Sequence, residues 1–164
     1  MITIRMSRAI FMKIVADLKR PHRFTVERVG WLFAKESSAG QDRIVLPIHY
    51  EAVPDDHYVE DEHVGARFGA TAIRSAMQRA RNGNHCCFQV HLHDHAGETD
   101  FSSVDEQTID ELAPAFAKMC PDRVHGGIVF TNDTARARVW AETGTLARSR
   151  VVIVGFPTKI GRLV

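Results

Sequence analysis

Residues 91–95 read His-Leu-His-Asp-His, and Ser102 and Asp105 follow within about a dozen positions. Two imidazoles one residue apart, with a carboxylate further on, are side chains that hold zinc in proteins. Three such ligands leave the fourth tetrahedral position open, which distinguishes a catalytic zinc from a structural one. The spacing therefore predicts a zinc hydrolase, provided that the chain also supplies a general base.

The alternation of side chains in a strand strengthens the case that these histidines form a site. In an extended strand His91, His93 and His95 point to one face, whereas Val90 and Leu92 point to the other. A single histidine there would be an ordinary polar residue on the outer face of an edge strand. Three together at the end of a strand are hard to explain by packing.

Ser102 and Asp105 are expected to open a helix. A serine commonly caps a helix, and an acid in the first turn complements the helix dipole, so each has a structural explanation when taken alone. Their joint spacing after the histidines favours a site. A zinc hydrolase also needs a base that is not a ligand, and Glu27 at the start of the apolar run 26–34 is the best candidate.

Together these motifs resemble the JAMM (JAB/MPN) zinc isopeptidase family, in particular its small standalone bacterial members. Residues 27–32 read Glu-x-x-Gly-x-Leu, the histidine run follows, and residues 102–105 read Ser-x-x-Asp. The match covers most of the chain in element order. The resemblance implies a cytidine-deaminase-like α/β sandwich, with a mixed sheet flanked by helices, in a single domain spanning residues 1–164.

The resemblance also assigns roles. Glu27 would be the general base, Ser102 would help to stabilise the oxyanion, and Asp105 would bind Zn²⁺ with two histidines. The family usually has seven residues between its second histidine and the serine. Pairing His91 with His93 leaves eight, and pairing His93 with His95 leaves six. The first pair is favoured because lengthening a loop costs little, and His95 is the alternative ligand.

The implied activity is cleavage after the C-terminus of a ubiquitin-like protein, in a precursor or a conjugate. Standalone bacterial members of this kind occur beside ubiquitin-like conjugation proteins, including in anti-phage operons. Asp94 or Asp100 is expected to orient a ligand imidazole. The acidic stretch Asp55–Glu62 could form a wall for a basic substrate tail, or could simply be a solvated loop.

Two other functions remain open at this stage. The chain could be a catalytically inactive scaffold of the same fold, although it keeps a candidate for every role. It could also be another zinc hydrolase acting on phosphoesters or small amides. The metallo-β-lactamase signature fails because His95 stands where that signature has an aspartate, and a deaminase would need paired thiolates that the chain lacks.

Composition agrees with a globular protein. A net charge of +1 gives no electrostatic argument for a nucleic-acid partner, and no run approaches the ~18 apolar residues of a membrane span. Three cysteines without Cys-x-x-Cys spacing suit a reduced protein, and the N-terminus lacks signal-peptide features, so the cytoplasm is expected.

Hydrophobic periodicity predicts an interleaved α/β chain. Helices are expected from the Ser7 cap to Leu18, over Thr71–Arg81 with Ile73, Met77 and Ala80 inward, and from a cap at Ser102 or Ser103 to Met119. Strands are expected over Met1–Arg5, Val26–Ala34, Arg43–Tyr50, Cys86–His93, Gly126–Thr131, Ala135–Glu142 and Arg150–Phe156, the second and third as a hairpin.

Overall fold

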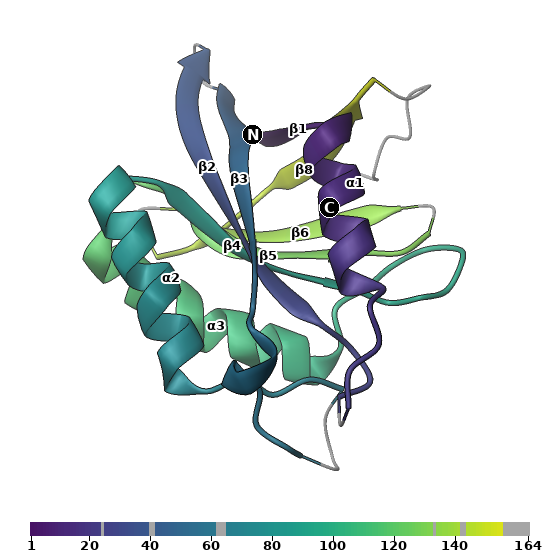
Figure 1. The fold of residues 1–164 in the computed structure, drawn as a ribbon. Coiled ribbons are helices and arrows are strands. Elements are labelled where there is room, and N and C mark those ends of the chain that lie inside the picture. The colour runs from purple at the N-terminus through teal and green to yellow at the C-terminus, as the bar shows by residue number, and fades with distance from the viewer. Residues whose placement is uncertain (24, 40–41, 62–64, 133, 142–143, 156–164) are drawn as a thin grey trace.

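The protein is a mixed α/β structure in which helices cover both faces of one large sheet (Figure 1). The computed structural model describes residues 1–23, 25–39, 42–61, 65–132, 134–141 and 144–155. Helix α1 lies on one face of the sheet, and α2 and α3 lie together on the other. The general α/β class expected from the sequence is confirmed.

The helices are α1 (Arg8–Leu18), α2 (Ala70–Gly83) and α3 (Ser103–Met119), with a short 3₁₀ turn at Asp55–His57. The strands are β1 (Ile2–Ser7), β2 (Val29–Ala39), β3 (Asp42–Ala52), β4 (Cys86–Leu92), β5 (His125–Phe130), β6 (Ala135–Trp140), β7 (Leu146–Ala147) and β8 (Ser149–Val154). The expected ends of the last two long strands, Glu142 and Phe156, lie outside the described residues.

The strands of the described chain run in the order β7-β6-β5-β4-β2-β3-β1-β8. Strand β4 lies in the middle, antiparallel to β2 and parallel to β5, and all of its residues are buried. The expected hairpin of β2 with β3 is confirmed.

Helices α1 and α3 are each capped at the N-terminus by a serine, as expected from the sequence. The Ser7 side chain accepts a hydrogen bond from the backbone N–H of Ile10, and Ser102 caps α3. Each cap satisfies one of the N–H groups that a first turn leaves without a partner.

Strand β2 begins three residues later than the expected strand. The N–H groups of Val26 and Glu27 both donate to the carbonyl of Gly65 instead of joining the sheet. Glu27 therefore lies before β2, in a segment held by a distant loop, and the prediction that it starts the strand is wrong.

Each face of the sheet has its own apolar core. The core beside α1 includes Ile14, Leu32, Phe88 and Phe130. The other contains Trp31, Phe33 and Phe116 and meets α2 through Ala72, Ala76 and Ala80. The buried stripe of α2 is thus made of alanines, including the expected inward residue Ala80, whereas Ile73 and Met77 are partly buried and pack against the same core.

No described helix combines the length and the apolar character that crossing a lipid bilayer would demand.

Candidate metal centre

The end of β4 brings His91 and His93 together. His91 is the penultimate residue of the strand and is 2% exposed. His93 follows the strand, and its backbone N–H donates to the carbonyl of Phe130, the last residue of β5. The two rings face each other with their Nε2 atoms 3.2 Å apart.

Asp105 reaches the same point from the first turn of α3. Its Oδ1 lies 3.3 Å from Nε2 of His91, and its Oδ2 lies 3.6 Å from Nε2 of His93. The backbone N–H and hydroxyl of Ser102 donate to Oδ2 at 2.8 and 2.7 Å, and the Asp105 N–H donates back to the serine oxygen. This capping box fixes the carboxylate as well as the start of the helix.

Asp105 is held in its charged form. Burial alone would raise the pKa of its carboxyl group, but the hydrogen bond and charge of His91 and the hydrogen bonds from Ser102 outweigh burial. The net effect lowers the pKa of Asp105 well below its ordinary value. A carboxylate that stays ionised is a suitable ligand for a divalent cation.

Glu27 completes the cluster from the other side. Its Oε1 lies 3.9 Å from Nε2 of His93. One potential ligand atom from each of Glu27, His91 and His93 lies within 4.8 Å of the others. The structure therefore brings together the five residues that the sequence assigned to the site: Glu27, His91, His93, Ser102 and Asp105.

The backbone that directly follows Glu27 is anchored by two side chains. Arg28 is 3% exposed; it donates to the carbonyls of Arg20 and Pro21 and pairs with Asp55 at 2.7 Å. The Tyr58 hydroxyl both accepts from the N–H of Val29 and donates to its carbonyl. Glu27 is thus presented by a fixed segment even though it lies outside the sheet.

The cluster opens into a cavity of about 190 Å³. Beyond the candidate residues, its wall consists of Val29, Gly65, Ala66, Phe68, Gln89, Val104 and Thr108. The segment 65–68 carried no signal in the sequence because long-range backbone contacts bring it there. Gln89 did carry one: it lies two residues before His91 and so shares its face of the strand.

His95 is not part of this arrangement. The strand ends at Leu92, so the parity that would align His95 with the other two is lost, and its Nδ1 contacts the carbonyl of Ala96. Its ring centre is 6.1 Å from that of His93, and its side chain is exposed. The expectation that three histidines share one strand face is wrong for His95.

The acids expected to orient a ligand imidazole contact other groups. Asp94 pairs with Lys19 and accepts from Asn132, and Asp100 pairs with Arg136. Neither contacts a candidate ligand, because the loop after His93 carries both side chains elsewhere. That prediction is wrong.

The acidic stretch after β3 is partly neutralised from within the protein. Asp55 pairs with Arg28, and Asp61 pairs with Arg67 at 2.8 Å. Glu62 lies outside the described residues. These internal pairs leave less acidic surface for a basic substrate tail than the sequence suggests.

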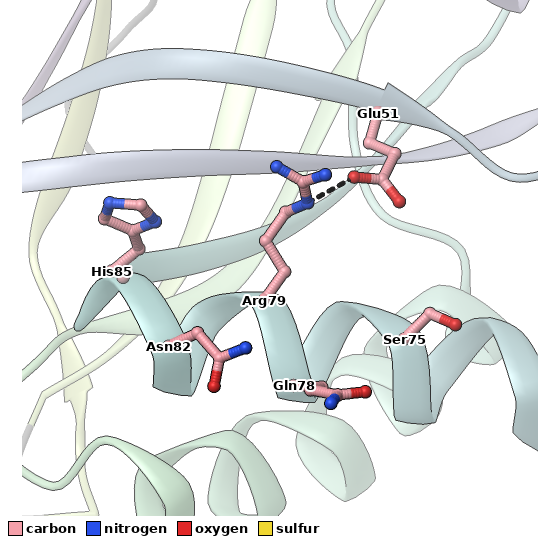
Figure 2. A pocket seen from close by; sticks show the side chains of 7 residues that line it. Glu51, Ser75, Gln78, Arg79, Asn82 and His85 are labelled. Carbon is pink, nitrogen blue, oxygen red and sulfur yellow. Dashed lines mark ion pairs between the residues drawn. The ribbon is translucent and has the colours of Figure 1, made fainter.

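A larger, more open hollow of about 510 Å³ lies between α2 and β3 (Figure 2). Arg79 extends from α2 across it to pair with Glu51 of β3. His85, Asn82 and Gln78 line it as well, and the five clustered residues do not. It is therefore separate from the candidate metal centre.

The spacing of the two imidazole nitrogens fits a tetrahedral ion. Zinc–ligand bonds of about 2.0–2.1 Å place neighbouring ligand atoms of a tetrahedron roughly 3.3 Å apart, and the Nε2 atoms of His91 and His93 are 3.2 Å apart. The Asp105 carboxylate approaches each of them with a different oxygen, Oδ1 at 3.3 Å from His91 and Oδ2 at 3.6 Å from His93. Two imidazole nitrogens and a carboxylate oxygen are also a donor set that zinc accepts in catalytic sites.

A scan of the chain against protein-family models finds no family that matches it, and a search of curated proteins finds no similar sequence.

Proposed function

We propose that this protein is a zinc-dependent peptidase or isopeptidase of the JAMM (JAB/MPN) kind, with a cytidine-deaminase-like fold. The observation that carries the proposal is the convergence of His91, His93 and Asp105: the two Nε2 atoms are 3.2 Å apart, the Asp105 carboxylate lies beside both, and Glu27 lies 3.9 Å from His93. The sequence motifs and the α/β layers that position them support the same conclusion. The proposed ligand pair is His91 with His93.

The position of each group in the site indicates the role that we propose for it. Zinc, when bound, would supply a water of lowered pKa and polarise the substrate carbonyl. With Asp105 assigned as the third ligand, Glu27 remains free to act on the water: its Oε1 lies 3.9 Å from Nε2 of His93, and it would take a proton from the attacking water and return it to the leaving amine. The cavity beside it would hold the scissile peptide out of bulk water.

Ser102 has two tasks in this proposal. Its hydroxyl donates to Asp105 and so orients a ligand. To stabilise an oxyanion, the same hydroxyl would have to turn from Asp105 toward the substrate carbonyl. Once its negative charge is shared with a cation, Asp105 accepts a hydrogen bond less strongly, which favours that rotation.

The proposed substrate is the C-terminal tail of a ubiquitin-like protein, cut in a linear precursor or an isopeptide conjugate. The cavity is small, about 190 Å³, and Gly65 and Ala66 form part of its wall, which suits an extended, small-residue tail better than a bulky one. By the same resemblance, we place the protein in the bacterial cytoplasm, in a ubiquitin-like conjugation system that acts against phage.

The first test separates the base from the ligands. Glu27→Gln should keep one zinc per chain and lose at least about 100-fold in cleavage, the contribution expected of a general base. His95→Ala is the matched control and should keep both zinc and activity. The measurements are metal content by mass spectrometry, and cleavage of ubiquitin-like C-terminal fusions and of an isopeptide-linked dimer.

If wild-type protein is purified in the presence of zinc and still contains no bound metal, the proposed hydrolase function is refuted and an inactive scaffold is favoured. Equal cleavage by wild type and Glu27→Gln would remove Glu27 from the mechanism.

A further inference from the structure

Three buried polar atoms on one face of the sheet have no hydrogen-bond partner among the described residues. They are Nε1 of Trp31, Oε1 of Gln89 and Nδ1 of His91. The three side chains are 3%, 6% and 2% exposed. A buried polar group without a partner costs about 1–3 kcal/mol, so three in one place call for an explanation.

The three residues are direct neighbours in the sheet. Trp31 of β2 lies opposite Gln89 of β4 in the antiparallel pair. Side chains in such positions have Cβ atoms about 4.5–5.5 Å apart. His91 is two residues further along β4 and therefore about 6.6 Å away on the same face.

Their chemistry is complementary. The Trp31 indole can only donate, and the Gln89 oxygen can only accept. A neutral His91 that offers Nε2 to a metal carries its proton on Nδ1, which then also donates. One carboxamide oxygen has two lone pairs, enough for both donors. Rotation of a glutamine carboxamide about its last torsion is soft, so a modest turn can bring that oxygen to both N–H groups.

A metal-binding imidazole almost always donates its second N–H to an oxygen, which fixes the ring and its tautomer. The two acids expected in that role, Asp94 and Asp100, contact Lys19 and Arg136 instead. Gln89 also lines the cavity with His91, as the neighbouring carboxamide on the same strand face.

We propose that Gln89 is a positioning residue of the candidate metal centre. Its carboxamide oxygen accepts the Nδ1–H of His91 and the Nε1–H of Trp31, and so holds Nε2 of His91 toward the ion. This inference rests on the proposed metal function. It adds a residue that acts on zinc through His91 and touches neither ion nor substrate.

The test uses two substitutions and a control in the full chain. Gln89→Met removes the acceptor at similar volume, and Gln89→Glu retains an acceptor oxygen. Cys87→Ala removes buried volume two residues away on the same strand face without touching the acceptor. Zinc dissociation constants are measured by competition with a chromogenic chelator, alongside thermal unfolding. We expect a 10- to 100-fold weaker zinc affinity for Gln89→Met, and affinities near wild type for Gln89→Glu and Cys87→Ala.

A second readout does not depend on zinc. In metal-free protein labelled with ¹⁵N-tryptophan, the ¹H shift of the Trp31 indole N–H reports whether that group donates a hydrogen bond. The signal, assigned by its loss in Trp31→Phe, should lie downfield in wild type and move upfield in Gln89→Met. An unchanged indole shift and an unchanged zinc affinity in Gln89→Met would overturn the inference. If wild type bound no zinc, the proposed function would fail, and the indole signal would still decide whether the Gln89 oxygen accepts from Trp31.

Discussion

Two of the three histidines at the end of β4, His91 and His93, meet at the candidate metal centre, and His95 lies outside it. The alternation of side chains in a strand correctly grouped His91 with His93, because both still follow the direction set by β4. It failed for His95 because no local pattern marks Leu92 as the end of the strand. The end is set by contacts with the loop after β5: the N–H of Asn132 donates to the carbonyl of His95. Such long-range contacts are invisible in the spacing.

Gly30 has a structural reason to be glycine. It belongs to the Glu-x-x-Gly motif noted in the sequence, and the motif alone gives no reason for it. In the fold, a Cβ at Gly30 would lie 2.3 Å from atoms of the Tyr50 ring. The Tyr50 hydroxyl in turn donates to Asp17 of α1 at 2.5 Å, which keeps the ring in place.

Gly30→Ala should therefore destabilise the protein. We expect a loss of about 1–3 kcal/mol in the free energy of unfolding, as for other overpacked cores, measured by urea denaturation. The same change in a Tyr50→Ala background should cost clearly less, because the ring that it meets is gone. Equal costs in both backgrounds would rule out the steric explanation.

Among the helices and strands, the boundaries predicted correctly are those set by nearby residues, and those missed are set by distant contacts or belong to very short elements. The sequence indicates a cap at Ser7 and another at Ser102 or Ser103, and α1 and α3 begin directly after Ser7 and Ser102, because a capping side chain acts within three residues. The start of β2 was missed because a carbonyl 38 residues away, that of Gly65, takes the N–H of Glu27. The two-residue β7 was missed because Leu146–Ala147 is too short to have a period.

The start of α3 joins folding to metal binding. Ser102→Ala should cost about 1 kcal/mol of stability through the lost cap. It should also weaken zinc binding, because Asp105 loses the hydroxyl that orients it. Ser103→Ala, at the next and equally exposed position, is the control. Chemical denaturation and chelator competition measure the two effects. A stable Ser102→Ala protein with unchanged zinc affinity would contradict this coupling.

At the scale of the whole molecule, His125 is a buried neutral imidazole joining β5, β4 and the end of α3. It is 1% exposed, its Nδ1 accepts from the N–H of Cys87, and its Nε2 contacts the carbonyl of Cys120. Burial lowers its pKa below the ordinary 6.5, although the bonds to Cys120 and Cys87 oppose the shift.

This group makes stability depend on pH. Below about pH 6.5 the unfolded chain takes up a proton at His125 that the folded chain resists, so stability is full above pH 7 and falls as the pH drops. Urea denaturation of metal-free protein from pH 8 to pH 5 should show this decline. His125→Asn should be less stable at pH 8 but should decline less steeply. A residual slope is expected from His49 and His85, whose pKa values burial also lowers. An unchanged slope would exclude His125 as a main source.

Strand β1 lies between β3 and β8, and it pairs in parallel with β8 over its whole length, Ile2 with Ser149 through Ser7 with Val154. During synthesis β1 emerges before every other described element and its partner β8 after all of them. Until β8 emerges, one backbone edge of β1 remains uncovered, and uncovered edges attract strands of other chains. The nascent sheet should therefore depend on chaperones until β8 is available to pair with β1.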